Sequence, residues 1–223
     1  MSVLVFDVET SGLFKEGNEP YITQLSYIVY DFNKKEITKV FDSYIQIPDN
    51  VVISDKITEL TGVTRDKCNK GIPIECALKE LYNDYHSVSV LIAHNYSFDS
   101  KMIKHEFTRN KEKLNNYENI DKLFTIPYLR EKGMRYVCTM KETTDICKVP
   151  FPEKKQLSIS TTSNEKKQRE YKWPTLKELH KHLFDTEPVG LHNSLIDVYI
   201  CLKCYLKYDK KYTMPDTDIN SLL

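Results

Sequence analysis

Residues 3–9 of this chain read VLVFDVE, and the architecture of the protein follows from them. The segment is apolar at successive positions, as in a central strand that is covered on both faces of a sheet. Side chains alternate along a strand, so Asp7 and Glu9 project to the same side at its end. Adjacent carboxylates repel each other unless a cation lies between them. The segment therefore predicts a central strand ending in a site for a hard divalent cation, with a solvated acidic turn as the alternative.

A second acidic position follows another apolar run, residues 88–93. The next six residues, 94–99, read HNYSFD, where His94 and Asn95 are expected in a loop. Ser97 is expected to cap a helix that begins near Phe98. Asp99 then lies in the first turn of that helix, close to the end of the preceding strand. The helix dipole also favours an acidic residue in a first turn, so Asp99 gains weight only together with the other acidic positions.

A third string, residues 191–197, reads LHNSLID. Within one helix, residues five apart are rotated by roughly 140°, so His192 and Asp197 converge only if His192 precedes the helix. The following residues are strongly apolar, which predicts a buried helix over 193–207. An unpaired aspartate on such a helix is costly, and this favours a functional role for Asp197 over a structural one.

These three strings resemble the motifs of the DEDDh 3′–5′ exonucleases, a group that includes the proofreading epsilon subunit of the bacterial replicative polymerase and ribonuclease T. The matching residues are Asp7, Glu9, Asp99, His192 and Asp197. The spacing from histidine to the last aspartate selects the histidine branch, because the tyrosine branch has tyrosine where this chain has Asn193. Ser194 stands where many relatives carry alanine.

The resemblance implies an α/β fold of the ribonuclease-H-like kind, a mixed five-stranded sheet flanked by helices. It also implies two divalent metal ions, Mg²⁺ or Mn²⁺, which stabilise the attacking and leaving oxygens. Asp7, Glu9 and Asp197 would hold the first ion, with Asp7 shared by the second and Asp99 contributing through water. His192 would accept the proton of the attacking water as general base.

The resemblance further implies residues that bind the end of the substrate. The segment after the acidic pair would contact the terminal nucleotide, the loop at Thr61 would pack on the terminal base, and an aromatic residue would lie near the next base. The substrate-binding residues expected on this basis are Thr10, Ser11, Leu13, Gly62, Val63, Asn95 and Phe98. For each of them, core packing or loop geometry is the alternative interpretation.

The remaining patterns predict a meander of strands followed by alternating strands and helices, which indicates a mixed sheet covered by helices. Strands are expected over 21–31, 37–47, 88–93 and 136–140, the first two joined by a turn at 33–35. Helices are expected over 54–61, 74–85, 97–109, 175–184 and 193–207, with a further helix near 119–130.

Composition fits a soluble, intracellular protein with no membrane association. Hydrophobic residues make up 40% of the chain, and no apolar stretch approaches the ~20 residues of a membrane helix. The chain enters directly into a strand, so no secretory signal is expected. Its six cysteines are expected to be reduced thiols. Cys201 and Cys204 have the spacing of half a zinc site but lie in an apolar helical stretch, which favours buried cysteines.

The net charge of zero conceals an asymmetry along the chain. Residues 1–66 carry 11 acidic and 6 basic side chains, and residues 148–172 carry 7 basic and 3 acidic ones. The basic segment suits contact with a phosphate backbone or a solvated, mobile loop over 151–172. We expect one exonuclease domain over 1–209 that includes this loop, and a C-terminal tail over 210–223.

The predicted function is a 3′–5′ exonuclease that acts on single-stranded nucleic acid with a free 3′ end, DNA being favoured, and releases 5′-mononucleotides. One alternative is an exoribonuclease that trims RNA, since no residue identifies itself as a sensor of the 2′-hydroxyl. Another is a non-catalytic polymerase-accessory or nucleic-acid-binding module on the same fold. A polymerase partner and a homodimer are both compatible with the sequence.

Overall fold

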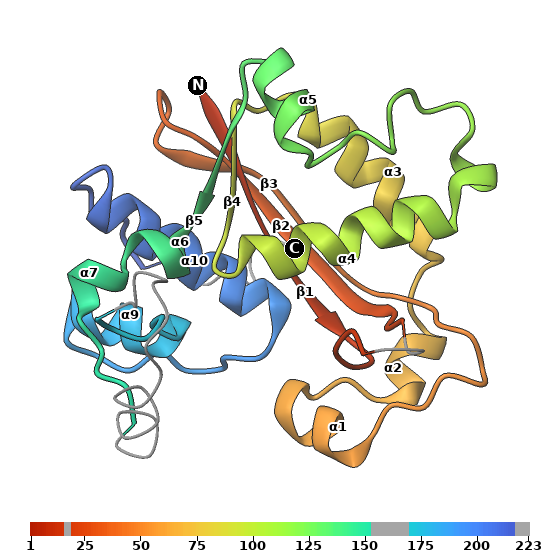
Figure 1. The fold of residues 1–223 in the computed structure, drawn as a ribbon, viewed down its shortest axis with the longest axis horizontal. Helices are drawn as coiled ribbons and strands as arrows, with labels where there is room; N and C mark the ends of the chain where they lie inside the picture. The colour runs from red at the N-terminus through yellow and green to blue at the C-terminus, as the bar shows by residue number, and fades with distance from the viewer. Residues whose placement is uncertain (16–18, 153–169, 217–223) are drawn as a thin grey trace, which may run out of the picture.

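The computed structural model describes residues 1–15, 19–152 and 170–216. Five strands form one mixed sheet in the order β3-β2-β1-β4-β5 (Figure 1). Their bounds are β1 Ser2–Thr10, β2 Ile22–Asp31, β3 Glu36–Tyr44, β4 Val90–Ala93 and β5 Arg135–Cys138. The first three strands pair antiparallel, whereas β4 is parallel to both β1 and β5. The predicted α/β fold with a mixed five-stranded sheet is confirmed.

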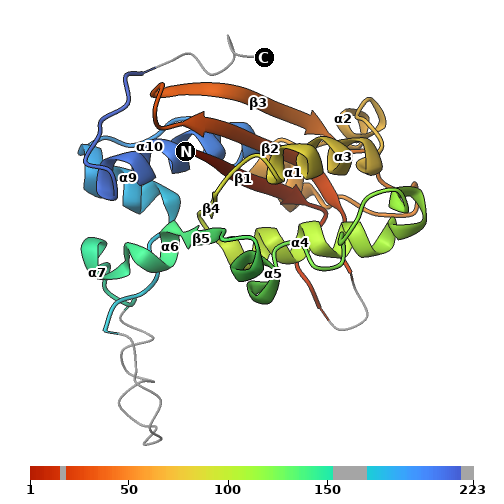
Figure 2. The same ribbon diagram turned by 90° about the horizontal axis from the view of Figure 1, so that it is seen from above.

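Helices cover both faces of this sheet. Their bounds are α1 Asp55–Thr61, α2 Arg65–Asn69, α3 Ile74–Tyr85, α4 Tyr96–Arg109, the 3₁₀ turn η1 Lys111–Leu114, α5 Ile126–Glu131, α6 Thr139–Glu142, α7 Thr144–Cys147, α9 Leu176–Phe184 and α10 Ser194–Tyr208. Figures 1 and 2 show α9 and α10 grouped on one side of the sheet and α3, α4 and α5 on the other. No helix in the described ranges is long and apolar enough to cross a bilayer.

Strand β1 lies at the centre of two hydrophobic cores. Leu4, Phe6 and Val8 face the core that α3, α4 and α5 complete, whereas Val3 and Val5 face the core beneath α9 and α10. Burial on both faces is why this strand is apolar at consecutive positions.

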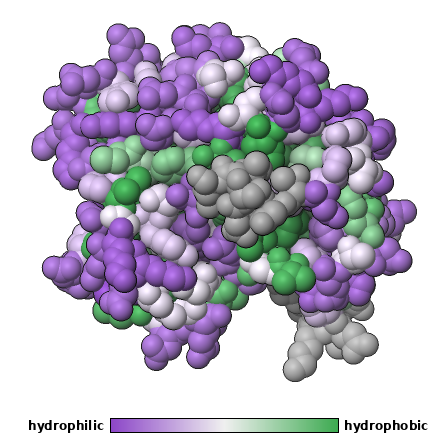
Figure 3. All heavy atoms as spheres, turned by 180° about the vertical axis from the view of Figure 1, so that it is seen from behind, coloured by the Kyte–Doolittle hydropathy of each residue, from purple (hydrophilic) through white to green (hydrophobic). Residues whose placement is uncertain are grey.

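On the side turned away in Figure 1, a group of apolar side chains interrupts a mainly hydrophilic surface (Figure 3).

The helix predicted near 119–130 is wrong over most of its length, because α5 begins only at Ile126. Asn119 and Phe124 have left-handed backbone conformations, with φ of 57° and 59°, which a right-handed helix cannot contain. The Phe124 ring packs against Phe6 and Tyr85, and its amide donates to the Tyr85 hydroxyl at 3.2 Å. Tertiary packing therefore determines this segment.

The start of α4 also differs from the prediction. The helix begins at Tyr96, with Asn95 as the N-cap residue. The Ser97 hydroxyl donates to the Asn95 side chain at 3.3 Å and does not cap the helix. The sequence patterns did not predict α2, a helix of five residues that is too short to show a period.

Two predicted segments extend beyond the described residues. Most of the basic loop at 151–172 falls at 153–169, outside the described part of the chain, as do residues 217–223 of the predicted tail. The described part of that tail packs on the domain: Met214 is buried in the core beneath α10, and Lys203 on α10 forms an ion pair with Asp216.

The strand order places a crevice beside β1. The chain continues from β1 to β2 on one side and returns to β4 on the other side, so the order reverses between β1 and β4. In α/β sheets, such a reversal leaves a crevice at the carboxyl ends of the parallel strands, where ligands bind. Strand β4 pairs only with residues 3–5 of β1, so the end of β1 that carries Asp7 and Glu9 extends past β4 at this switch point.

Candidate active site

Three carboxylates converge at the end of β1. Asp7 and Glu9 project from the strand, Asp197 comes from α10, and one ligand oxygen from each lies within 4.8 Å of the others. A β-bulge between Glu9 and Thr10 interrupts the pairing of β1 with β2 immediately after the acidic pair. Bulges of this kind redirect side chains beside functional sites. The predicted convergence of the first and third motifs is therefore observed.

The start of α10 positions Asp197. Asn193 caps the helix by accepting hydrogen bonds from the amides of Leu195 and Ile196 at 3.2 and 3.3 Å. His192 lies on the loop before the helix, as predicted, with a left-handed φ of 69°. This uncommon conformation directs its backbone N–H at the Asp197 carboxylate, 3.3 Å from both oxygens. The His192 side chain is exposed at the rim of the site.

A glycine makes this loop possible. Gly190 has a φ of 79°, and a Cβ built there would lie 2.6 Å from Cδ1 of Ile196 on α10. A larger residue at this position would be strained by the positive φ, and the end of the Ile196 side chain would have to shift to make room for it.

Asp99 lies on the opposite wall, in the first turn of α4. It is only 3% exposed, and its backbone amide donates to Asn95 at 3.3 Å. Burial raises the pKa of Asp99 well above its ordinary value, and the charge of nearby Asp7 adds to this rise. Asp99 is outside the three-carboxylate cluster defined by the 4.8 Å separation.

Burial perturbs every member of the cluster, and repulsion from neighbouring carboxylates adds to its effect on Glu9 and Asp197. Burial raises the pKa of Asp7 to about 7. Burial, followed by repulsion from Asp7 and Asp197, raises the pKa of Glu9 to about 9. Burial and the charge of Asp7 raise the pKa of Asp197 to about 8. Three carboxylates cannot all be ionised here at low cost without a compensating cation.

The cluster fits a divalent cation. All of its donors are carboxylate oxygens, the ligands that Mg²⁺, Mn²⁺ and Ca²⁺ prefer over soft or nitrogen-rich sets. A bound cation also removes the electrostatic cost that raises the three pKa values. Asp7, Glu9 and Asp197 are therefore the residues that would hold it.

Ser194 links the two elements that carry the cluster. It is fully buried, and its hydroxyl donates to the main-chain carbonyl of Asp7 at 2.8 Å. The side chain at this position, noted in the sequence as a departure from alanine, thus fastens the first turn of α10 to the metal-binding end of β1.

A half-buried histidine that the sequence did not single out connects β4 to two later parts of the chain. His94, at the end of β4, makes ring-nitrogen hydrogen bonds to the Thr139 hydroxyl at 3.0 Å and to the Pro174 carbonyl at 3.1 Å. Burial lowers the pKa of His94 to about 4, so it stays neutral at physiological pH. Thr139 in turn lies 3.6 Å from the sulfur of Cys201 on α10. Only the tertiary structure brings these residues together.

The residues expected to bind substrate are arranged unevenly. Leu13 is 64% exposed on the loop after β1, available to a ligand. The Ser11 hydroxyl accepts from the Tyr21 amide at 3.0 Å, and the Thr10 hydroxyl donates to the Gly12 carbonyl at 2.7 Å, so both side chains shape the loop. Phe98 is partly buried against the core.

The Val63 side chain follows the alternative given for it, core packing. Val63 is 0% exposed and packs with Ile47 and Cys68 in a small separate cluster. Gly62, which ends α1 with a φ of 68°, exposes only backbone beside it. Asn95 is half-buried at the start of α4, adjacent to the crevice.

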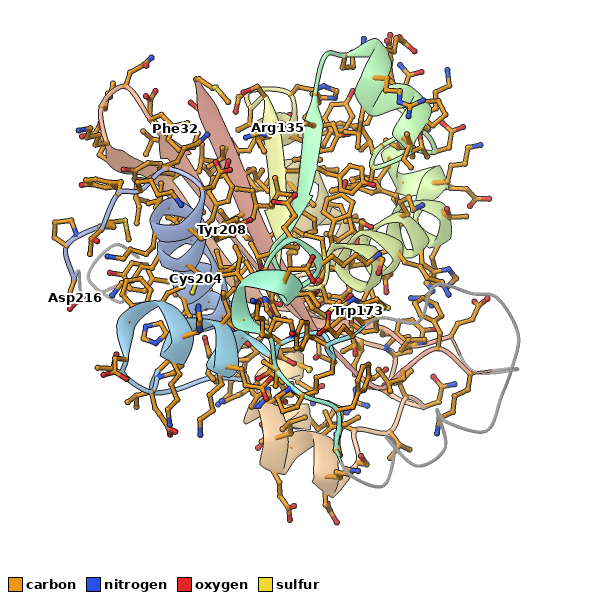
Figure 4. All side chains as sticks on the ribbon, turned by 60° about the vertical axis from the view of Figure 1, so that its left-hand side comes forward. Phe32, Arg135, Trp173, Cys204, Tyr208 and Asp216 are labelled. Carbon is orange, nitrogen blue, oxygen red and sulfur yellow. The ribbon has the colours of Figure 1, made fainter. Side chains whose placement is uncertain are left out.

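Four of the six cysteines are buried, among them Cys201 and Cys204, for which the sequence favoured burial. All six are free thiols, and Cys201 and Cys204 are buried in α10, where Figure 4 labels Cys204. Burial raises the pKa of both thiols, which disfavours the thiolate form that zinc requires. Among the described residues, no metal-binding cluster includes a cysteine.

Solved structures with this fold are nucleases. The nuclease domain of 3′hExo, a DEDDh family member bound to rAMP, is 17% identical and aligns with a TM-score of 0.62 over 96% of this chain and 94% of its own. Escherichia coli Exonuclease I in complex with a dT13 oligonucleotide is 16% identical, with a TM-score of 0.63 over 94% of this chain and 42% of its own. The fold is thus that of the ribonuclease-H-like nucleases.

The family follows from the sequence match. Residues 4–156 match the exonuclease family RNase_T. This segment exceeds half of the chain and contains Asp7, Glu9 and Asp99. The protein therefore belongs to the RNase_T exonuclease family. His192 and Asp197 lie beyond the matched segment, and the structure places them beside it.

Two curated relatives are replicative polymerase components. DNA polymerase III subunit epsilon of Buchnera aphidicola subsp. Schizaphis graminum is 25% identical over 207 residues, which cover 92% of this chain and 72% of the relative. DNA polymerase III PolC-type of Oceanobacillus iheyensis is 30% identical over 140 residues, which cover 60% of this chain and 9% of that longer protein.

The raised carboxyl pKa values predict how stability depends on pH without metal. Folded Asp7, Glu9 and Asp197 titrate at about 7, 9 and 8, whereas unfolded carboxyls titrate near ~4. The folded state therefore holds more protons, and the free energy of unfolding should fall as the pH rises between ~4 and ~9. Thermal unfolding in chelator at successive pH values measures this effect.

The control for that measurement is the double variant Asp7→Asn with Glu9→Gln, which should show a flatter pH dependence. Saturating Mg²⁺ should stabilise the wild type more at pH 8 than at pH 5, because the ligands must be deprotonated to bind it. Identical pH profiles for the wild type and the double variant would contradict the raised pKa values.

The link through Ser194 makes a second prediction. Ser194→Ala should lower the free energy of unfolding by about 1 kcal/mol, because it removes a buried hydrogen bond without steric conflict. Ser97→Ala, which removes an exposed hydroxyl from the same region, is the matched control and should stay within ~0.5 kcal/mol of wild type. Denaturant titration in chelator measures both variants. Equal stabilities would show that the Ser194 hydrogen bond contributes nothing.

Proposed function

We propose that this protein is a 3′–5′ exonuclease that hydrolyses single-stranded nucleic acid from a free 3′ end and releases 5′-mononucleotides with the aid of two divalent metal ions. The observation that carries the proposal is the meeting of Asp7, Glu9 and Asp197 within 4.8 Å. Asp99 faces this cluster from α4, and His192 lies at its rim.

The chain's own residues divide the work between them. Asp7, Glu9 and Asp197 would hold one ion, and Asp99, whose charge interacts with that of Asp7, would help to hold the second. When bound, the ions supply positive charge that activates water and stabilises the charge developing on the phosphate. His192 is exposed next to Asp197 and accepts the proton of the attacking water. The hydrogen bonds from the His192 amide to the Asp197 carboxylate hold the general base next to the metal ligand.

DNA is the favoured substrate. Its support is the similarity to DNA polymerase III components and the fold shared with an Exonuclease I solved with dT13. RNA trimming is the second candidate, because another protein of the same fold was solved with rAMP. The overall charge of zero suits an enzyme that grips a few nucleotides at a chain end better than one that holds a long duplex.

The proposal extends to the assembly and the location of the protein. A polymerase partner is supported by the relatives, and a homodimer is the alternative. We place the protein inside the cell as a soluble enzyme, with an exonuclease domain over residues 1–209. A non-catalytic accessory module is disfavoured because Asp7, Glu9, Asp99, His192 and Asp197 are all present.

The end-directed reaction is tested with an oligonucleotide labelled at its 5′ end. A free 3′ hydroxyl should give a ladder that shortens one nucleotide at a time, and a 3′ phosphate should slow its formation. Chelator should abolish the ladder and Mg²⁺ or Mn²⁺ should restore it, because the carboxylates cannot act alone. Parallel DNA and RNA substrates of one sequence measure the preference between them.

The matched controls are Asp7→Asn and Asp99→Asn, which keep the side-chain shape and should each lower the rate by more than ~100-fold. Efficient cutting of circular single strands would show an endonuclease. Full activity in chelator would refute the metal mechanism.

The role of His192 makes a further prediction. His192→Ala should lower the catalytic rate by ~10²–10⁴-fold, the usual contribution of a general base. Oligonucleotide affinity measured with Ca²⁺ should change little, because the backbone amide that contacts Asp197 remains. His182 is exposed on α9, so His182→Ala is the control and should keep the wild-type rate. A His192→Ala enzyme of normal rate would make this residue structural.

A further inference from the structure

A pocket of about 430 Å³ lies beside α4, outside the carboxylate cluster. It is bounded by the first half of α4, the start of α5, strand β5 and helix α6. Its lining consists of Tyr96, Ser97, Ser100, Lys104, Phe124, Thr125, Ile126, Pro127, Tyr136, Cys138 and Lys141. None of these residues belongs to the site proposed for the terminal nucleotide or the metal ions.

An aromatic platform forms one wall of the pocket. The ring of Tyr136 on β5 stacks on the ring of Tyr96, with centroids 4.6 Å apart and an interplanar angle of 26°. Tyr96 is buried and also contacts Phe6 edge-on at 5.7 Å, so the lower ring of the pair is held in the core. Tyr136 remains 43% exposed. A ring fixed in this way offers a flat surface to a planar ligand at small entropic cost.

The pocket is also cationic. It contains the ammonium groups of Lys104 and Lys141, and none of the described residues that line it carries a carboxylate. Lys141 also lies over the ring of Trp173, 5.7 Å from its centroid, and Figure 4 shows Trp173 beside α6. A pocket lined by a planar stacking surface and two lysines is complementary to a base with its phosphates.

The position of the pocket connects it to the active site. Tyr96, Ser100 and Lys104 recur every four residues on α4 and therefore share one face, while Asp99 in the same turn faces the carboxylate cluster. Strands β1, β4 and β5 are parallel, so Cys138 lies at the same edge of the sheet as Asp7 and Glu9. Figure 1 shows α6 next to the start of α4 at this edge. A nucleic-acid strand that crosses the start of α4 would reach both the carboxylate cluster and the pocket.

We propose that this pocket binds a nucleotide of the substrate strand upstream of the scissile bond. The base stacks on Tyr136, and Lys104 and Lys141 contact the adjacent phosphates. The proposal rests on the exonuclease function proposed above and adds a second point of grip on the strand. If the proposal is right, the affinity of the protein for oligonucleotides increases at the length that first reaches the pocket.

The test measures binding of labelled oligonucleotides of 1 to 12 nucleotides by fluorescence anisotropy, with Ca²⁺ replacing Mg²⁺. The variants are Tyr136→Ala, Tyr136→Phe and the double variant Lys104→Gln with Lys141→Gln. The charge-matched control is Lys34→Gln with Lys35→Gln, on the β2–β3 turn at the opposite end of the sheet. Thermal unfolding confirms that each variant is folded.

We expect wild-type affinity to rise in a step at one length. Tyr136→Ala should weaken binding of longer oligonucleotides about 5- to 150-fold, the usual effect of losing one stacked base, and leave shorter ones unchanged. Tyr136→Phe should restore the step because it keeps the ring. The Lys104 and Lys141 double variant should reduce the slope of log affinity against log salt by ~1.4 for long strands only, about 0.7 for each phosphate that a lysine no longer neutralises.

Two outcomes would overturn the proposal: no change in any variant, or an equal loss at all lengths including the mononucleotide, which would make the pocket a site for free nucleotides. Cleavage of dinucleotides tests the exonuclease function independently, because a dinucleotide is too short to reach the pocket. All pocket variants should cleave them at the wild-type rate. If the wild type itself releases no mononucleotides from any length, the exonuclease function fails and not merely the upstream site.

Discussion

The candidate site depends on one constraint, the close approach of three half-buried carboxylates. Asp7, Glu9 and Asp197 meet within 4.8 Å at the end of a strand that is covered on both faces, where burial raises the pKa of each group. The protein maintains an arrangement that is unfavourable without a cation. Because a bound cation would remove this electrostatic cost, such a cluster has affinity for hard divalent ions.

The surrounding fold supplies the rigidity that this arrangement needs. Ser194 fastens α10 to β1, the strained backbone at His192 directs an amide at Asp197, and neutral His94 connects β4 to Thr139 without adding charge. These contacts join four separate parts of the chain. They lie near the point where the strand order reverses between β1 and β4, which is where ligands bind in α/β sheets.

The carboxylate cluster and the pocket proposed to bind the substrate strand lie at the same edge of the sheet. The carboxylates occupy the end of β1, while the aromatic and cationic pocket lies beyond α4, near the end of β5. Helix α4 serves both, with Asp99 on one face and Tyr96, Ser100 and Lys104 on another. A division of this kind separates the chemistry at the terminal nucleotide from affinity for the strand, so either property can change with little effect on the other.

Local patterns in the sequence were enough to predict the central strand, the mixed sheet and the identity of the acidic residues, because strand periodicity and short motifs are local properties. They also placed His192 on the loop before α10, since helical geometry excludes the alternative. Long-range packing was needed to establish that residues 119–125 form turns, that the Val63 side chain is buried against Ile47, and that His94 meets Thr139. Each of these depends on contacts between residues distant in the chain, whose packing overrides local preference and leaves no periodic signal in the sequence.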